Sequence, residues 1–506
     1  MSDQSQPPVL PWDAYNQTLV ANVHPAHWTN PTPAPRYNLV VIGGGTAGLV
    51  SAIGAAGLGA KVALIEKHFL GGDCLNVGCV PSKALLAAAH TAATVRGAGA
   101  LGVEVQGGIR VEFAKVMERM RKLRSDISPH DSAKRLSDLG IDVFLGQGRF
   151  LDASTVVVGD AKLSFAKAVI CTGARASAPP IVGLDTVPHL TNETLFSLTE
   201  LPRRIGIIGA GPIGCEMAQA FARFGSEVYL VESAPRILGK EDAEAADIIR
   251  KQLVKDGVNI FCGGNDLELA PGDGVRMSVE CEGKHYDLAV DQLLIAVGRA
   301  PNVEGLDLEK AGVAHTTKGV TIDDRFRTTN KRIFAAGDIC SPYQFTHAAD
   351  FMARAVIRNA FFFGRAKHSA LVVPWCTYTS PELAHIGLTP SDAAKQGIAI
   401  DTFTQPMTGV DRAILEGDVD GFVRVHVKKG RDDIVGATIV ASHAGDMIGS
   451  FSIAMTQGIG LGSIANCIHP YPTQGEAVRK VGDLYSRTRL TPLVKKLMQR
   501  WLAWLR

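Results

Sequence analysis

The chain has 506 residues, and its 52 Lys and Arg against 50 Asp and Glu give a formal net charge of +2 at pH 7. A chain of this length is too long to fold around one ordinary hydrophobic core, which predicts several domains. The nearly balanced charge gives no reason to expect a nucleic-acid partner. Nine scattered cysteines, an odd number, do not form the pattern of a small secreted disulfide scaffold.

The first residues of the chain bear on where the protein is located and on how its N-terminal segment folds. Its opening MSDQSQPPVLPWDAYNQ has neither a basic region nor an apolar run, so we expect no signal peptide. No other stretch reaches membrane-spanning length without charge, and the expected location is the reducing cytoplasm. Residues 1–36 contain many prolines, Trp12 and Trp28, and predict an extended arm that packs on the body through its aromatic side chains.

Two segments repeat one pattern. Residues 37–67 read YNLVVIGGGTAGLVSAIGAAGLGAKVALIEK, which predicts a strand, a glycine turn, a small-residue helix and a second strand that ends in an acid. Residues 203–233, RRIGIIGAGPIGCEMAQAFARFGSEVYLVES, repeat it. Alternating segments in residues 372–470 predict a mixed sheet with helices. We therefore expect an α/β protein with two Rossmann-like dinucleotide-binding domains and a C-terminal α+β domain.

Both units have the spacing GxGxxG. In the first unit, one glycine permits the tight turn, the next admits a pyrophosphate close to the backbone, and the third allows close helix packing. The acid that ends the second strand can accept hydrogen bonds from a ribose hydroxyl. These residues are Gly43, Gly45, Gly48 and Glu66 in the first unit, and Gly209, Gly211, Gly214 and Glu232 in the second.

The second acid also bears on which nucleotide binds. A carboxylate at Glu232 accepts a hydrogen bond from a free 2′-hydroxyl and repels a 2′-phosphate, so it favours NADH over NADPH. Arg236 lies four residues further along and leaves NADPH open.

Residues 71–83, GGDCLNVGCVPSK, place Cys74 and Cys79 five positions apart. The pair can be a redox-active disulfide, half of a metal site, or two inert thiols. Pro81 is expected to open a helix, so the pair would lie at a helix N-terminus, which lowers a thiol pKa. A zinc site needs further ligands, and residues 60–95 offer only His68 and His90. A redox pair is therefore the favoured interpretation, and the other two stay open.

The segment GGDCLNVGCVPSKALL, together with the two glycine fingerprints, resembles the class I pyridine nucleotide-disulfide oxidoreductases. The resemblance covers residues 37–485 and implies FAD in the first unit, NADH or NADPH in the second, and a homodimer with active sites shared between subunits. The expected parts are an arm (1–36), an FAD-binding domain (37–185 and 300–367), an NAD(P)H-binding domain (186–299), a dimerisation domain (368–485) and a basic amphipathic helix (486–506).

The resemblance also implies residue roles. Cys79 would lie against the flavin and Cys74 would be the interchange thiol, while Lys83 would lie near flavin N5 with Glu216 as its carboxylate partner. Asp338 would take a ribityl hydroxyl. Further expected cofactor-binding residues are Thr172, Gly173, Gly298 and Arg299. Electrons would pass from NADH through the flavin to the cysteine pair and then to an acceptor.

Residues 469–476, HPYPTQGE, depart from the HPTxxE motif of the family's disulfide reductases. Aligning PT and Glu476 puts Tyr471 at the place of the histidine, with His469 two residues early. A phenol with a pKa of about 10 is a poor base at neutral pH. The tyrosine is similar to the PYxTxxE pattern of mercuric reductases, so Hg(II) is the expected acceptor, a substrate held by Cys74 and Cys79. We expect no structural metal.

Other features keep different acceptors open. Mercuric reductases end in a vicinal cysteine pair and carry an N-terminal GMTCxxC domain, whereas this chain ends in WLAWLR and its last cysteine is Cys467, expected to be buried. Hg(II) would then arrive directly from thiol complexes in solution. One alternative is reduction of a disulfide such as lipoamide, as in dihydrolipoamide dehydrogenase, with His469 in the missing role. A second is a membrane-docked electron-transfer flavoprotein that reduces a quinone or a partner protein.

The last residues, 486–506, predict a basic amphipathic helix. Such a helix can lie on an anionic membrane surface, which adds peripheral contact at the inner face of the membrane to the expected location. Docking on its own protein or on a partner subunit is the more common arrangement, and we favour it. One side of the helix carries Leu490, Leu493, Val494, Leu497, Trp501 and Leu505, and the other mostly Lys495, Lys496, Arg500 and Arg506.

Overall fold

The computed structural model describes residues 9–177 and 179–506. The described residues form two compact units. The first comprises those within Met1–Gly209, Ala220–Tyr229 and Asn265–Leu371, and the second Ala210–Gln219, Leu230–Gly264 and Val372–Arg506. No helix among them is long and apolar enough to cross a membrane. The finer domain boundaries expected from the sequence stay predictions.

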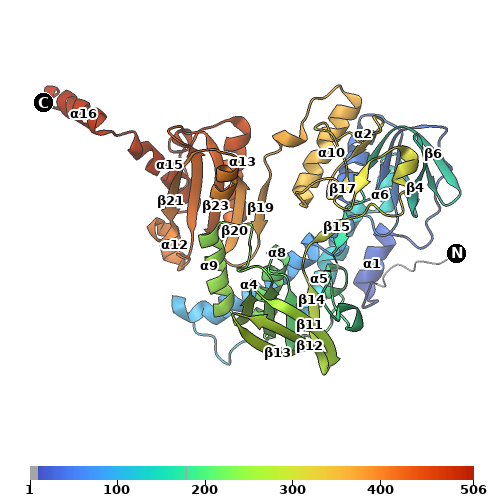
Figure 1. Ribbon diagram of the computed structural model, residues 1–506, viewed down its shortest axis with the longest axis horizontal. Helices are drawn as coiled ribbons and strands as arrows, with labels where there is room; N and C mark the ends of the chain where they lie inside the picture. The colour runs from blue at the N-terminus through green and yellow to red at the C-terminus, as the bar shows by residue number, and fades with distance from the viewer. Residues whose placement is uncertain (1–8, 178) are drawn as a thin grey trace. The chain divides into compact units, whose positions relative to one another are not determined.

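The first unit is built on a sheet of seven described strands in the order β3-β2-β1-β6-β5-β4, with β18 also pairing with β6 (Figure 1). The strands β1, β2, β3, β6 and β18 are parallel, and β5 and β4 continue the sheet antiparallel. Their bounds are β1 (Tyr37–Ile42), β2 (Val62–Glu66), β3 (Ile141–Leu145), β4 (Gly148–Asp152), β5 (Thr155–Val158), β6 (Ala161–Ile170) and β18 (Ile333–Ala335).

Because the carboxyl ends of parallel strands meet at one edge, this topology gathers four separate loops. The glycine turn follows β1, Glu66 ends β2, the Thr172 and Gly173 loop follows β6, and Asp338 follows β18. Full burial of β2 on both faces agrees with its continuous apolar sequence. The predicted first Rossmann-like domain is confirmed.

The remaining elements of the first unit surround this sheet and form smaller sheets. Strand β8 pairs parallel with β14, β7 pairs with β15, β16 pairs with β17, and β11, β12 and β13 form an antiparallel sheet. The helices are α1 (Ala14–Val23), α2 (Thr46–Gly57), α3 (Gly72–Asn76), α4 (Cys79–Gly97), α5 (Phe113–Ile127), α6 (Ala133–Asp138), α7 (Asn192–Leu195) and α10 (Thr346–Phe361). The strands are β7 (Ala174–Ala176), β8 (Arg204–Ile208), β11 (Asn265–Gly272), β12 (Gly274–Cys281), β13 (Lys284–Val290), β14 (Gln292–Ile295), β15 (Arg299–Pro301), β16 (His315–Thr316) and β17 (Gly319–Val320).

The second unit contains a five-stranded antiparallel sheet in the order β19-β20-β23-β22-β21 among its described residues. Helices α13 and α15 bury apolar side chains with it, including Phe451 and Val481 beside Val425 and Ile439. Its elements are α9 (Ala243–Lys255), β10 (Val258–Cys262), β19 (Pro374–Thr377), β20 (Glu382–Gly387), α11 (Pro390–Lys395), β21 (Ile400–Pro406), α12 (Asp411–Glu416), β22 (Phe422–Lys428), β23 (Ile434–Ala441), α13 (Ala444–Gln457), α14 (Leu461–Ile464), α15 (Glu476–Thr488) and α16 (Pro492–Trp504). Helix α8 (Pro212–Phe224) and strand β9 (Glu227–Glu232) run through the division between the units.

The N-terminal segment differs from the expected extended arm, because residues 14–23 form helix α1. The Asp13 carboxylate accepts a hydrogen bond from the Asn16 N–H at 2.9 Å and caps the helix. Leu19 and Val23 are buried, whereas Trp12 is exposed, so α1 docks through aliphatic side chains. Trp28 does follow the expectation and donates from Nε1 to the Val143 carbonyl at 3.0 Å.

Two buried arginines of α5 hold α1 in place. Arg121 Nε donates to Asp13 at 2.6 Å, and Arg124 donates to the Asn16 side chain at 2.7 Å. Arg124 also donates to the Asn76 carbonyl at 2.6 Å, at the end of α3. Burial lowers the pKa of Arg124 to about 10, so it stays charged at neutral pH. The arm is thereby connected to the segment that carries Cys74.

We expect Asp13→Ala to loosen α1. Loss of an N-cap costs about 1 kcal/mol, which corresponds to roughly fivefold faster hydrogen exchange of the α1 amides if they exchange by local opening. Mass-spectrometric exchange of a peptide covering residues 14–23 measures this. Asp13→Asn keeps the cap and is the matched control, expected to change exchange less. Equal exchange in Asp13→Ala and the parent protein would contradict a capping role.

Candidate active site

The cysteine segment forms two helices. Cys74 lies in the short helix α3, and Cys79 is the first residue of α4. Helix α4 thus begins two residues before Pro81, the residue at which the sequence predicted the helix to begin. Pro81 falls in the first turn, whose N–H groups have no partner within the helix, so its missing N–H costs no helical hydrogen bond. A side chain on Gly78 would bring its Cβ to 2.8 Å from the Asp73 carbonyl oxygen, which explains the glycine before Cys79.

Both cysteines are thiols in this structure and are hydrogen-bonded to each other. The Thr346 hydroxyl lies 3.3 Å from Cys79 Sγ and also bonds to Cys74. Thr346 is the first residue of α10, and neither α4 nor α10 has a side-chain cap. The Cys79 sulfur therefore lies where two helices begin, and their N-terminal dipoles favour a thiolate there.

The two thiols differ in character. The hydrogen bond to Cys79, followed by burial and the Cys79 charge, raises the pKa of Cys74 well above its ordinary value, while the Thr346 hydroxyl opposes this. The expected lowering of a thiol pKa is therefore wrong for Cys74. The physical reason is that neighbouring sulfurs cannot readily both carry a charge, so Cys74 keeps its proton and donates a hydrogen bond to the Cys79 sulfur.

A partly buried ion-pair group connects the cysteine segment to the sheet edge. The Arg299 guanidinium donates to the Asp73 carboxylate and to the Ala174 carbonyl at 2.7 Å, and lies 3.6 Å from the Asp338 carboxylate. Arg299 thus contacts the residue beside Cys74, the strand after Gly173 and the loop after β18. Sequence reasoning named Arg299 and Asp338 but missed Asp73, whose only signal was its place inside the cysteine motif.

Asp338 has an unusual environment for a carboxyl group. Burial raises its pKa to about 6, and the negative charges of Asp73 and Cys79 add to this, while Arg299 opposes it. Arg299 contacts both Asp338 and Asp73, the residue before Cys74, so Asp338 lies near the cysteine segment. The sheet edge therefore brings the predicted ribityl ligand close to the predicted redox pair.

The first glycine turn fits the FAD that the resemblance implies. Gly43 has φ +107°, and a Cβ there would lie 2.3 Å from the Cys171 carbonyl oxygen. A Cβ on Gly48 would lie 1.8 Å from the Gly43 oxygen, so only glycine permits this close packing. Helix α2 starts after Gly45 without a side-chain cap, which leaves N–H groups for a pyrophosphate. Gly72 packs against Gly45 and brings the cysteine segment to this turn.

The two predicted ribose acids make the same local contacts. Glu66 accepts from the N–H groups of Gly44 and His68, each at 2.6 Å, and burial raises its pKa. Glu232 accepts from Ala210 at 2.8 Å and Ala234 at 2.9 Å, the equivalent positions of the second motif. Each carboxylate therefore braces its own glycine turn. Gly209, with φ +100°, repeats the close approach of Gly43, because a Cβ there would lie 2.6 Å from the Ala296 oxygen.

Arg236, which the sequence left as a ligand for a 2′-phosphate, is bound to its own loop. Its Nη2 donates to the carbonyls of Gly239 and Glu241, each at 2.8 Å. Gly211 precedes α8 and Gly214 lies within it, as the motif predicts. Gly298 has φ +116° immediately before Arg299, which shows why a glycine stands at that turn.

The predicted lysine and glutamate lie on separate helices. Lys83 is half-buried on α4, one helical turn after Cys79. Glu216 is buried on α8 and accepts a hydrogen bond from the Tyr378 N–H at 2.9 Å. Their pairing stays a prediction. Thr172 is better defined, since its hydroxyl donates to the Asn302 carbonyl at 3.0 Å and holds the loop after β6.

In the C-terminal motif HPYPTQGE, a tyrosine stands in place of the family's histidine base, and its contacts differ from those of a base. The Tyr471 hydroxyl donates to Asp411 at 2.9 Å, and this bond raises its pKa. Glu476 is buried and accepts from Arg479 at 2.9 Å. His469 is half-buried, with Nδ1 3.1 Å from the Cys467 carbonyl oxygen. Cys467 is exposed, which corrects the expectation that it is buried, because it follows the end of α14 in a surface loop.

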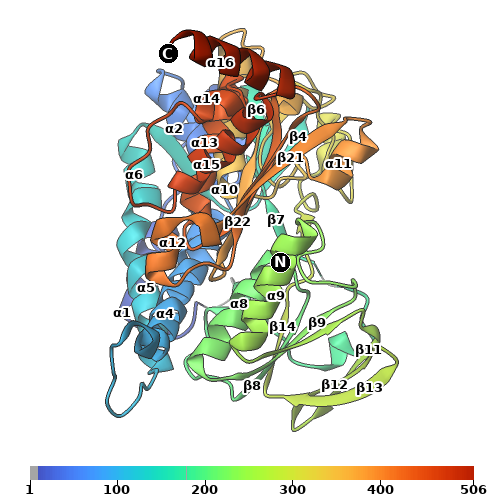
Figure 2. The same ribbon diagram turned by 90° about the vertical axis from the view of Figure 1, so that its left-hand side faces the viewer.

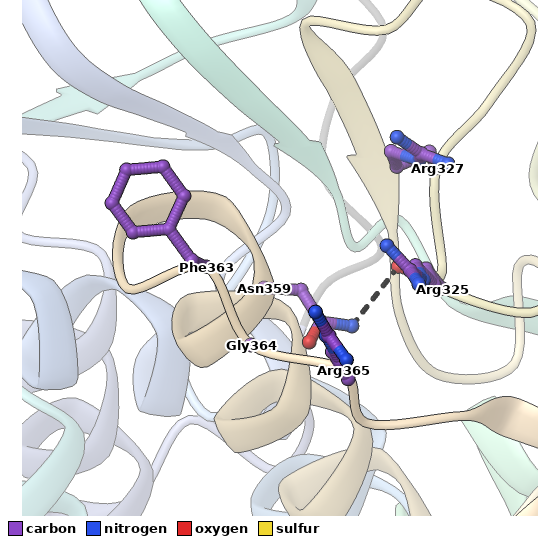
Figure 3. A pocket seen from close by; sticks show the side chains of 6 residues that line it. All are labelled: Arg325, Arg327, Asn359, Phe363, Gly364 and Arg365. Atoms are coloured by element: carbon purple, nitrogen blue, oxygen red, sulfur yellow. Dashed lines mark hydrogen bonds between the residues drawn. The ribbon is translucent and has the colours of Figure 1, made fainter.

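A separate cavity of about 330 Å³ lies in the first unit and contains none of the predicted site residues (Figure 3). Asn359 crosses it and donates to the Arg325 carbonyl at 3.2 Å. Its lining residues are Arg325, Arg327, Asn359, Phe363, Gly364 and Arg365. Within the described parts of the chain, no group of three or more His, Cys, Asp or Glu side chains could hold a metal ion.

Comparison with known proteins identifies the family. Residues 37–353 match the family described as pyridine nucleotide-disulphide oxidoreductase, and residues 373–481 match its dimerisation domain. Mercuric reductase from Bacillus cereus is 34% identical over 445 residues, which cover 88% of this chain and 70% of the relative. Dihydrolipoyl dehydrogenase from Bacillus subtilis (strain 168) is 32% identical over 464 residues, 88% of this chain and 97% of the relative.

Solved structures agree with this assignment. The HOCl-induced flavoprotein disulfide reductase RclA from Escherichia coli matches with a TM-score of 0.78 at 30% identity, covering 88% of this chain and 100% of that chain. The Cu(II) complex of RclA matches with a TM-score of 0.78 at 29% identity, covering 89% of this chain and 100% of that chain. The chain therefore belongs to the pyridine nucleotide-disulfide oxidoreductase family, whose members are FAD-dependent enzymes that use NADH or NADPH.

We expect Thr346→Val to shift thiolate formation in the reduced pair to higher pH by about one unit. A hydrogen bond to a charged group contributes about 1.5–3 kcal/mol, and one pKa unit corresponds to about 1.4 kcal/mol. The rate of alkylation by iodoacetamide against pH, with the labelled cysteine identified by mass spectrometry, measures the shift. Thr346→Ser retains the hydroxyl and should retain the profile. A profile unchanged in Thr346→Val would show that the hydroxyl does not stabilise the thiolate.

Proposed function

We propose that this protein is an FAD-dependent NADH oxidoreductase that passes two electrons through Cys74 and Cys79 to a thiol-bound metal ion, with Hg(II) as the favoured acceptor. The observation that carries the proposal is the hydrogen-bonded thiol pair, in which Cys79 lies at the start of both α4 and α10. The dimerisation domain supports a homodimer, with active sites shared between the subunits.

FAD would accept a hydride from NADH and pass the electrons to the cysteine pair. The first glycine turn would hold its pyrophosphate, Glu66 a ribose, and Asp338 a ribityl hydroxyl. Thr172, Gly173, Gly298 and Arg299 would complete its binding loops. Lys83 and Glu216 would lie near the flavin ring, as the family motif implies. The close packing of Gly72 on Gly45 supports this arrangement, because it brings the cysteine segment to the phosphate turn.

The contacts of Tyr471 favour a metal acceptor over a disulfide. Reduction of a disulfide releases a thiolate that a nearby acid must protonate. The Tyr471 hydroxyl is bound to Asp411 and its pKa is raised, and Glu476 is paired with Arg479. Hg(II) is a soft ion that two thiolates bind without such help. The reaction balances as NADH and Hg(II) giving NAD⁺, Hg(0) and one proton.

The similarity to the Bacillus cereus mercuric reductase supports this acceptor. RclA, a flavoprotein disulfide reductase with a similar fold, has been solved as a Cu(II) complex. Cu(II) is therefore a second metal to test. The similarity to dihydrolipoyl dehydrogenase supports the alternative of a disulfide such as lipoamide, for which the half-buried His469 would have to act as the acid.

We expect purified protein to oxidise NADH when Hg(II) is supplied as a complex with excess small thiol, with one Hg(0) formed per NADH. The double variant Cys74→Ser/Cys79→Ser should lose about a hundredfold or more of this rate, because the electrons then have no thiol route to the metal. NADH oxidation, corrected for the reaction with oxygen, and mercury vapour measure both products.

Lipoamide reduction in the same preparation distinguishes the acceptors. The metal proposal would be overturned in favour of a disulfide reductase by two results together. The first is that NADH reduces the flavin but Hg(II) gives no turnover. The second is that the protein reduces lipoamide and that His469→Ala abolishes this activity. Hg(II) turnover that is unchanged in His469→Ala would support it.

We also propose NADH as the preferred nucleotide, because Glu232 ends β9 and accepts from the second glycine turn, and Arg236 is bound to loop carbonyls. We expect kcat/KM to be at least about tenfold higher for NADH, as expected for a charge-assisted hydrogen bond to the 2′-hydroxyl. Steady-state kinetics with both nucleotides measures the ratio. Arg236→Ala is the diagnostic variant: a selective loss of NADPH activity would show that Arg236 binds the 2′-phosphate and would contradict this reading.

A further inference from the structure

Helix α16 lies apart from the sheet of its own unit. It follows α15 after a short connection, and Figures 1 and 2 show it projecting beyond the other elements of the second unit. None of its residues is buried. Trp504 is 74% exposed and Leu493 is 68% exposed. The docking of this helix on its own protein, which the sequence favoured, is therefore not found among the described residues.

Helix α16, with its C-cap Leu505, divides into two halves. At about 100° per residue, all its large apolar side chains fall within one half of the helical projection. Trp501 and Trp504 lie together there, with ring centroids 5.2 Å apart. The apolar half consists of Leu493, Val494, Leu497, Met498, Trp501, Leu502, Trp504 and Leu505.

The opposite half is entirely cationic or neutral. It carries Lys495, Lys496, Gln499, Arg500 and Ala503, and Arg506 follows the helix. Residues 484–506 contain six Lys or Arg and no Asp or Glu. Without these six residues the chain has fewer basic than acidic residues, so its net positive charge depends on this segment. The positive charge is therefore concentrated beside an exposed apolar surface.

This combination fits an anionic lipid surface better than a protein groove. A helix that docks on a protein usually buries a narrower apolar stripe, of about 100° or somewhat more. Tryptophan side chains favour the membrane–water interface, where one end of the ring is apolar and the other wet. With 13 residues, α16 is about 20 Å long, too short to span a bilayer. It would lie in the plane of the interface.

We propose that α16 and its flanking residues bind the surface of membranes that contain anionic phospholipids, with the apolar half among the acyl chains and the basic half toward the headgroups. This proposal does not depend on the acceptor at the cysteine pair. It places the enzyme at a membrane surface whichever substrate it reduces.

Flotation of the full-length protein with vesicles tests the proposal. We expect binding to vesicles of phosphatidylglycerol and phosphatidylcholine, weak binding to phosphatidylcholine alone, and weaker binding at high salt, because screening reduces the attraction. Trp501→Ser/Trp504→Ser should reduce binding at least about tenfold by removing apolar area, and Lys496→Glu/Arg500→Glu should do so by reversing charge. Gln499→Ala, on the polar half, is the matched control and should bind normally.

Three outcomes would overturn the proposal: no binding to anionic vesicles, equal binding to both vesicle types, or equal binding by both double variants and the parent. Light scattering after size exclusion, without lipid, distinguishes the competing occupant. A change of oligomeric state in Trp501→Ser/Trp504→Ser, combined with no vesicle binding by the parent protein, would show that the helix docks on a second copy. Flavin reduction by NADH should be unchanged in all variants, which verifies that they fold.

Discussion

The parallel pairing of β1 with β2 and β6, and of β6 with β18, is the constraint on which the candidate active site depends. It makes the carboxyl ends of four strands coincide, and these ends and the loops after them carry the glycine turn, Glu66, Thr172 and Asp338. A slip of one residue in any pairing would exchange the two faces of that strand. The backbone register, more than any single side chain, therefore determines where the cofactor-binding loops meet.

The chemistry of the cysteine pair follows from helix placement on this scaffold. Helix α4 starts at Cys79 and α10 starts at Thr346, so two sets of N–H groups converge near one sulfur. Arg299 supplies a positive charge near this region, balanced by Asp73 and Asp338. Because Cys74 retains its proton while Cys79 lies in the favourable field, the two thiols are chemically distinct before any substrate arrives.

The two ends of the chain have different relations to this site. Helix α1 is connected to the cysteine segment through Arg124, which contacts both Asn16 and Asn76, so the N-terminal arm belongs to the support of the redox loop. Helix α16 has no such support and exposes both of its halves. One end thus contributes to the geometry of the site, and the other presents a surface for contacts outside the chain.

The sequence by itself determined the features that depend on local spacing. The glycine fingerprints, the acids after them, the cysteine pair and the two halves of the last helix are all readable because each occupies one short segment. The tertiary structure decided which distant residues meet. Thr346 is 267 residues from Cys79, and Arg299 is 226 residues from Asp73. No local pattern encodes such contacts, because they arise only when the strand order brings separate loops to one edge. The same reason explains α1: Asp13 could be read as a cap, but its partner Arg121 lies 108 residues away.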